Sequence, residues 1–302
     1  MRTEAAFDFP PSQPWRSDDI EIIPMSRHVG AEVRGVDLAN FSDREFAVIH
    51  EAWLKHLVLV FRDQSLTDAD QIAFSRRFGT LDLAPLDEQG RRGVPDHPEI
   101  LIISNVVENG RPIGALGAGE SVWHIDMSYN PVPPKASALY SLEVPPSGGN
   151  TGFLSCYAAC ETLPDDLRRR VETVSIKHDA TINSAGNRRF GVGPVTDVST
   201  SPGAVHPAIH THPETGREAL YLGRRLYAYV EGMPVAESEA LLDELWAHTT
   251  QEAFTWHHSW RTGDLVLWDN RCVMHRRDAF DNAKRRVMHR TQIQGEKPVR
   301  HL

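Results

Sequence analysis

The chain has 302 residues, of which 40% are apolar and 24% charged, as in an ordinary globular protein with a sizeable core. Its formal net charge of −9 argues against nucleic acid as the main partner, because phosphate binding needs a basic surface. No apolar run is long enough to span a membrane, and the first residues lack the apolar core of a signal peptide. Three cysteines without a CxxC pair predict neither a disulfide framework nor a cysteine zinc site, and they favour a reducing cytoplasm.

Composition along the chain predicts one folded domain behind a short arm. Residues 1–20 carry three prolines and little periodicity, so we expect a loosely ordered N-terminal arm. Residues 21–302 contain no internal repeat and no long linker, and we interpret them as a single domain.

The first half of this domain predicts two capped helices and several strands. Ser42 and Glu45 form a capping box ahead of a helical pattern, and Thr67 caps a second helix. Apolar runs at 57–61 and 100–104 predict buried strands. The segment 110–120 holds four glycines in no phosphate-loop spacing, so we interpret it as a mobile segment and a candidate substrate lid.

The second half predicts strands at 136–144 and 151–156, a helix begun by Thr162, and a long polar excursion over 181–204. A further amphipathic helix is expected over 236–248, followed by a hairpin that joins 254–260 to 264–268. Many short strands without regular βαβ alternation favour a β-sandwich or barrel with flanking helices.

A possible metal site is indicated by two separated motifs. In Trp123-His124-Ile125-Asp126, a strand would point His124 and Asp126 to one face and Ile125 to the other. With a distant His275 they would make a two-histidine, one-carboxylate triad, which leaves positions open on ferrous iron. The H-x-D pair alone is weak evidence, since a chain with 15 histidines and 41 acidic residues forms such pairs by chance.

The stretch that follows His275 carries two arginines with strand spacing. If residues 285–293 form a strand, Arg286 and Arg290 share one face and His289 takes the other. Two guanidinium groups on one face, a short loop away from His275, predict an anion site beside a metal.

Taken together, these motifs resemble the taurine dioxygenase and 2,4-dichlorophenoxyacetate dioxygenase family of Fe(II)- and 2-oxoglutarate-dependent oxygenases. The resemblance is carried by the following stretches, in family order between about residues 57 and 298: LVFRDQSLTDADQIAFSRRFG, WHIDMSYNPVPPKASALYSLEVPPSGGNTGFLSCYAACETLP, HPAIHTHPETGREALYL and GDLVLWDNRCVMHRRDAFDNAKRRVMHRTQIQGEKP. It implies a mainly β protein whose core is a double-stranded β-helix, or jelly roll, flanked by helices.

Residue by residue, the resemblance implies that His124, Asp126 and His275 are the iron ligands. Thr151 and Arg286 match the pair that holds the far carboxylate of 2-oxoglutarate, and Arg290 matches an arginine that receives a substrate anion. For Arg290 the alternative is an ion pair with a neighbouring acid. With O2 as second co-substrate, the expected reaction hydroxylates a C–H bond of a small anionic substrate and releases succinate and CO2. The expected substrate is a taurine-like sulfonate, a sulfate ester or a carboxylate.

The sequence does not decide the identity of the substrate or the oligomeric state. Where the taurine enzyme has a histidine, a tyrosine and an asparagine near its substrate, this chain aligns Ala84, Asp87 and Glu120, which puts taurine itself in doubt. A cationic group near Asp87 or Glu120 is one hypothesis. The family suggests a dimer or tetramer. Rival functions are a non-heme iron oxygenase that does not use 2-oxoglutarate and a non-catalytic ligand-binding jelly roll.

The remaining histidines and Cys272 suggest structural roles. His206, His210 and His212 have metal-like spacing, but the triad is complete without them, so we expect hydrogen-bonded core positions. Of His257 and His258, on an alternating strand, only one can face inward. Cys272 is expected to be a small core hydrophobe.

Overall fold

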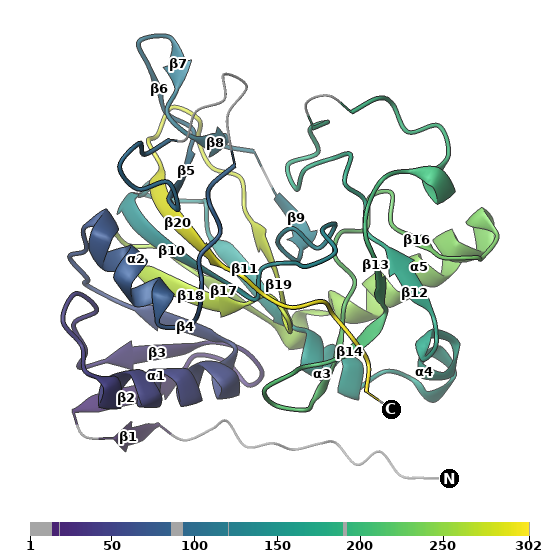
Figure 1. The fold of residues 1–302 in the computed structure, drawn as a ribbon, viewed down its shortest axis with the longest axis horizontal. Helices are drawn as coiled ribbons and strands as arrows, with labels where there is room; N and C mark the ends of the chain where they lie inside the picture. Colours follow the sequence, from purple (N-terminus) through teal and green to yellow (C-terminus); the bar gives the residue numbers. More distant parts are fainter. Residues whose placement is uncertain (1–13, 18, 86–92, 120, 190–191, 302) are drawn as a thin grey trace.

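Two β-sheets form the centre of the protein in a computed structural model, which describes residues 14–17, 19–85, 93–119, 121–189 and 192–301 (Figure 1). The larger sheet has the order β1-β2-β3-β4-β18-β10-β20-β5-β8, and a four-stranded sheet has the order β17-β11-β19-β9. The strands of the larger sheet are β1 Trp15–Ser17, β2 Ile20–Pro24, β3 Ala31–Arg34, β4 Val58–Phe61, β5 Leu101–Ser104, β8 Ala115–Leu116, β10 Ala136–Glu143, β18 Leu265–Asp269 and β20 Val287–Ile293. Those of the smaller sheet are β9 Ser121–His124, β11 Thr151–Ser155, β17 Thr255–His258 and β19 Val273–Arg277.

Short sheets and helices surround these two. The remaining strands are β6 Val107–Glu108, β7 Arg111–Pro112, β12 Ser175–Lys177, β13 Val205–Pro207, β14 Ile209–Thr211, β15 Glu218–Leu220 and β16 Tyr229–Val230. The helices are α1 Asp43–His56, α2 Asp68–Arg76, α3 Cys156–Glu161, α4 Asp165–Val171 and α5 Val235–Thr249, with 3-10 turns at Val198–Thr200 and Glu252–Phe254. The expected fold class is confirmed: a mainly β protein with a jelly-roll core and flanking helices.

Alternation along the strands separates two cores. On β4, Val58 belongs to the cluster between the sheets, whereas Leu59 and Phe61 belong to a second cluster beneath α1 and α2. Both helices begin as predicted, with capping boxes formed by Ser42 with Glu45 and by Thr67 with Asp70. The helices therefore cover the outer face of the larger sheet and leave its inner face to the site.

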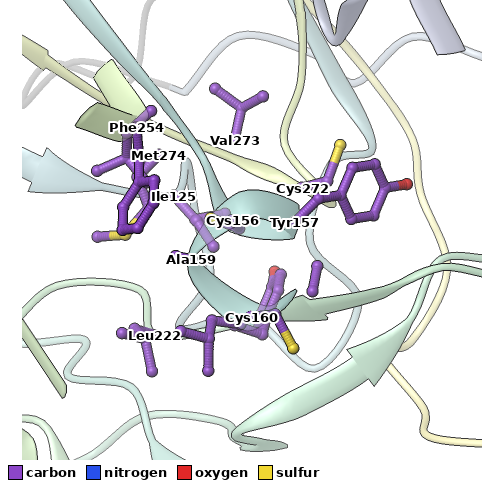
Figure 2. Close-up of a cluster of buried hydrophobic side chains, with 14 of the residues drawn as sticks. Ile125, Cys156, Tyr157, Ala159, Cys160, Leu222, Phe254, Cys272, Val273 and Met274 are labelled. Atoms are coloured by element: carbon purple, nitrogen blue, oxygen red, sulfur yellow. The ribbon is translucent and has the colours of Figure 1, made fainter. Parts of the chain in front are cut away.

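The short helix α3 lies at the centre of the main core (Figure 2). Cys156, Tyr157 and Cys160 of α3 are buried there together with Val273 and Met274 of β19. Ile125 points into the same cluster, although its two chain neighbours are the candidate ligands. Because Ile125 and Met274 are fixed in the core, period-two alternation sends His124, Asp126 and His275 to the opposite side.

Two element predictions were wrong. Strands β17 and β18 do not form a hairpin, because β17 pairs with β11 of the smaller sheet and β18 with β4 and β10 of the larger one. Thr162 does not start a helix: it ends α3, where its hydroxyl donates to the Ala158 carbonyl at 2.7 Å, and α4 begins at Asp165. The hairpin fails because its strands pair with distant segments, and the Thr162 hydroxyl bonds back to the preceding turn instead of capping the next helix.

The N-terminal boundary expected at about residue 20 falls between two paired strands. Trp15–Ser17 forms β1 on the edge of β2, while residues 1–13 and 18 lie outside the described part of the chain. Within the described residues, no helix is long and apolar enough to cross a membrane.

Candidate active site

Three side chains meet as predicted at one end of the smaller sheet. His124 closes β9, Asp126 follows two residues later, and His275 lies on the neighbouring β19, directly opposite His124 in the register. One ligand atom from each lies within 4.8 Å of the others, and all three residues are buried. Asp126 Oδ1 is 3.6 Å from His124 Nε2 and 3.8 Å from His275 Nε2.

The protonation state of this group suits a cation. His124 Nδ1 lies 2.7 Å from the Val122 carbonyl, which accepts its proton and leaves the Nε2 lone pair facing the triad. Burial, and then His124, lowers the pKa of His275 to about 3, so this imidazole is neutral. Burial alone would raise the pKa of Asp126, but Arg290 and the two imidazoles outweigh it and hold that pKa well below its usual range. Two imidazoles and one carboxylate, with their ligand atoms converging, fit a divalent metal ion.

A chain of hydrogen bonds holds the Asp126 carboxylate from behind. Ser137 on β10 donates to Asp126 Oδ2 at 2.9 Å, and Asn270 Nδ2 donates to the Ser137 hydroxyl at 3.1 Å. Trp268 Nε1 in turn donates to Asn270 Oδ1 at 2.9 Å. Trp268 lines the cavity and also packs beside His275, with ring centroids 4.8 Å apart. The larger sheet thus fixes the orientation of a ligand carried by the smaller one.

Arg286 and Thr151 lie in the same cavity as the triad. Arg286 is 2% exposed, and no carboxylate of the described residues pairs with it. Burial and then the nearby Arg277 lower the pKa of Arg286, so a bound anion would stabilise its charged form. Thr151 Oγ1 accepts a hydrogen bond from Trp260 Nε1 at 2.9 Å, which leaves the threonine proton free to donate.

A glycine permits this close packing around the guanidinium. Gly149 has φ +66°, and a Cβ added there would lie 3.4 Å from Arg286 Nε. Its left-handed backbone and lack of a side chain therefore suit the approach of the loop to Arg286.

Arg290 enters the cavity from β20 and contacts the triad itself. Its Nη1 lies 3.2 Å from both oxygens of Asp126, so the predicted alternative, an ion pair with a neighbouring acid, is present in the structure. As predicted from strand alternation, His289 points the other way, and its Nδ1 lies 2.6 Å from Asp68 on α2.

These groups line a cavity of about 860 Å³ between the two sheets. Part of the glycine-rich segment, from Arg111 to Leu116, forms one wall of this cavity, and its role as a substrate lid stays a prediction. Arg277, two residues after His275, donates to the carbonyls of Leu116 (2.9 Å) and Gly119 and fastens that wall. The segment also contains two short strands, β7 and β8, whereas the sequence predicted only a mobile segment.

The other histidines hold structural positions. His206 Nε2 lies 2.8 Å from the Ser128 carbonyl, and His210 Nε2 contacts the Arg271 carbonyl. His258 is fully buried against Asp264, whereas His257 is exposed. A second group, His212 with Asp269 and Cys272, has metal-like proximity, but both Asp269 oxygens also accept from Arg271.

Sequence reasoning did not single out three residues that the structure brings to this site. Ser137 lies on β10, and Arg277 lies on β19 two residues after His275. No local sequence pattern distinguishes either residue from other polar strand residues. Arg189 belongs to the long polar excursion, and only the folding of the chain brings it to the cavity wall. Of the positions proposed to select the substrate, Ala84 is buried, and Asp87 and Glu120 lie outside the described residues.

Comparison with known proteins identifies the family. The model of the taurine catabolism dioxygenase TauD, TfdA family matches residues 21–292. The chain belongs to this family. An (S)-phenoxypropionate/alpha-ketoglutarate-dioxygenase of Sphingobium herbicidovorans is 36% identical, with 93% of this chain and 96% of the relative covered.

A second curated relative and a solved structure support the same family assignment. An alpha-ketoglutarate-dependent 2,4-dichlorophenoxyacetate dioxygenase of Cupriavidus pinatubonensis is 37% identical over 88% of this chain and 95% of its own. The crystal structure of a taurine dioxygenase from Burkholderia xenovorans superposes with a TM-score of 0.77 at 33% identity, covering 93% of this chain and 91% of the other. The protein is accordingly a 2-oxoglutarate-dependent dioxygenase of the taurine dioxygenase type, a family that uses Fe(II) and O2.

Proposed function

We propose that His124, Asp126 and His275 hold the Fe(II) ion, that Thr151 and Arg286 hold the far carboxylate of 2-oxoglutarate, and that Arg290 faces the prime substrate. One observation carries this proposal: the three converging ligand atoms share a cavity with a buried guanidinium, Arg286, that has no acidic partner among the described residues. A molecule with a chelating end and an anionic end, as 2-oxoglutarate has, would engage both features.

The residues of the chain position and shield the reactants. When bound, Fe(II) and 2-oxoglutarate supply the oxidising chemistry, in which O2 is consumed, a substrate C–H bond is hydroxylated, and succinate and CO2 are released. Arg286 and the Thr151 hydroxyl orient the co-substrate by charge-assisted hydrogen bonds. Ser137 and Arg290 keep Asp126 ionised and correctly rotated. The wall fastened by Arg277 excludes water from the cavity.

For the prime substrate we propose a small anion with an apolar body. The cavity combines apolar residues such as Ile103, Leu116 and Leu139 with several arginines. Relatives named for phenoxypropionate, 2,4-dichlorophenoxyacetate and sulfate esters act on molecules of this kind. A carboxylate or a sulfate ester with an apolar body therefore suits the site.

We further propose a cytoplasmic homo-oligomer, a dimer or tetramer. Three apolar side chains, Val122, Leu226 and Val235, are 49%, 44% and 42% exposed and line one shallow hollow, as at an interface between subunits. Light scattering coupled to gel filtration would give the mass, and a monomer at micromolar concentration would contradict this part.

The central assignment is tested by anaerobic titration with Fe(II) and 2-oxoglutarate. A visible metal-to-ligand charge-transfer band should appear in the wild type and be lost in His124→Ala. A band that persists in His124→Ala would overturn the ligand assignment, and its absence from a folded wild type would favour a non-catalytic jelly roll. A band that forms without 2-oxoglutarate dependence would favour an oxygenase of the other non-heme type.

A further inference from the structure

A second group of arginines lines the wall of the cavity formed by the long excursion after β12. Arg188 and Arg189 lie on the returning arm of a turn, in which Asn183 N donates to Asn187 O and Arg189 N donates to Thr181 O, both at 2.8 Å. Arg224, which follows β15, lines the same wall. We name these three residues the distal arginine group. In Figure 1 this excursion, teal to green, stands across from β5 and β20, and Arg286 directly precedes β20.

Arg224 is a structural member of the distal arginine group. It is buried, and its two Nη atoms donate to the carbonyls of Ile182 and Asp179. It therefore holds the base of the turn and is not free to bind a ligand through those atoms.

Arg188 and Arg189 have donors to spare. Arg189 stacks on Tyr129 with its Cζ 4.1 Å from the ring centroid, and its Nε is buried without a hydrogen-bond partner. Arg188 is exposed at the edge of the cavity and makes no ion pair with any described residue. Tyr129 follows Asp126 by three residues, so this platform is tied to the metal loop.

The neighbouring polar groups add donors rather than acceptors. Asn183 Oδ1 already accepts from the backbone N–H groups of Ala185 and Asn187, which leaves its NH2 free. Ser184, also in the wall, offers a hydroxyl. The one acidic side chain among the described lining residues is Asp126, and it is held by Arg290 in the metal group. Among the described residues that line this wall, no acidic side chain offsets the positive charge of Arg188 and Arg189.

Much of the remaining lining is apolar. Ile102, Ile113, Leu116 and Met127 line the same cavity as the distal arginine group, Arg286 and Arg290. A ligand that fills such a cavity would have a hydrocarbon or aromatic body with an oxygen-rich anion directed at each charged end.

We propose that Arg188 and Arg189, on the Tyr129 platform, form a second anion subsite that binds a carboxylate or sulfate group at the end of the prime substrate remote from the metal. This inference rests on the proposed function, which supplies the metal end of the cavity. Arg290 faces the near end of the same substrate. A molecule with an anion at each end would therefore contact Arg290 at one end and Arg188 and Arg189 at the other.

The test is calorimetric binding to the anaerobic protein loaded with Fe(II) and 2-oxoglutarate. The probes are α,ω-dicarboxylates from heptanedioate to dodecanedioate, each paired with the monocarboxylate of equal length. At the fitting length the dicarboxylate should bind at least about tenfold more tightly than its monocarboxylate, as one charge-assisted contact gives. Arg189→Met and Arg188→Gln/Arg189→Met should remove this advantage and leave monocarboxylate binding within about twofold.

The matched control is Arg225→Met, which alters an adjacent arginine that pairs with Glu239 and Asp243 outside this cavity. It should retain the full preference, and Arg189→Lys, which keeps the charge, should retain part of it. The subsite is refuted if no dicarboxylate in the series outperforms its partner, or if the advantage survives in the double variant. Failure of the proposed function is distinguishable, because 2-oxoglutarate itself would then not bind the wild type.

Discussion

The guanidinium of Arg290 lies against the carboxylate of Asp126, with Nη1 3.2 Å from both of its oxygens. This contact joins the two sheets, because Asp126 follows β9 of the smaller sheet and Arg290 is on β20 of the larger. It also makes Arg290 relevant to the metal as well as to the substrate.

Replacement of Arg290 by Met should weaken metal binding at low pH. Without the guanidinium the pKa of Asp126 rises, and protons compete with the metal more strongly as the pH falls. We expect Mn(II) affinity to change little at about pH 7, where the carboxylate stays ionised, and to fall more steeply than in the wild type between about pH 5.5 and pH 4. Calorimetric titration of the metal-free protein with Mn(II) measures this affinity at each pH. Metal affinity unchanged at every pH, combined with weaker substrate binding, would restrict Arg290 to the substrate.

Arg286→Ala should raise the 2-oxoglutarate requirement strongly. If Arg286 binds the far carboxylate of 2-oxoglutarate as proposed, the variant removes the buried partner of that carboxylate, a loss of about 3–5 kcal/mol. Arg285→Ala is the matched control, since that neighbouring side chain is exposed and pairs with Glu143 and Glu108. Succinate formation as a function of 2-oxoglutarate concentration gives the KM. A larger effect on prime-substrate binding than on 2-oxoglutarate would reverse the assignments of Arg286 and Arg290.

Alternation along single strands made much of this site predictable. The spacing of His124 and Asp126 and of Arg286 and Arg290 fixes which side chains share a face, and the structure places all four in one cavity. The capping residues Ser42 and Thr67 were also predictable, because a cap is formed within four residues.

The contributions of Ser137, Arg277 and Arg189 were not predictable from local sequence. Ser137 reaches Asp126 from the other sheet, and Arg277 bonds backbone carbonyls that any residue could supply. The wrong hairpin has the same origin, since the turn at 261–263 transfers the chain between sheets and its strands find partners far away in sequence. Such pairings depend on topology, which periodicity does not encode.

Ser137→Ala should lower metal affinity about tenfold while the fold is retained. The variant deletes the 2.9 Å hydrogen bond to Asp126 Oδ2 and leaves Asn270 Nδ2 without its acceptor. Ser141→Ala is the control, because Ser141 is equally buried on β10 but bonds the Arg261 and Asp264 carbonyls. Calorimetry with Mn(II) compares the two. Equal affinities in both variants would show that the network does not orient the ligand.

His210 should contribute to acid destabilisation. Burial lowers its pKa to about 4, below the 6.5 of the unfolded chain, so the unfolded state binds the proton more readily. Stability from this group is complete above about pH 6.5 and is lost as the pH falls towards 4, by up to about 3 kcal/mol. Urea unfolding of the metal-free protein at several pH values measures the slope. His210→Gln should flatten it, and an identical slope would exclude His210 as a source.

Arg277→Met should loosen the wall of the cavity without changing the metal ligands. Arg277 holds the carbonyls of Leu116 and Gly119, and its loss frees the segment 115–119 from β19. Hydrogen exchange of these amides should accelerate, and 2-oxoglutarate turnover without prime substrate should rise because water enters more readily. Arg276→Met is the control, since Arg276 contacts Asp278 and Trp123 instead. Exchange rates equal to wild type in Arg277→Met would show that other contacts fasten this wall.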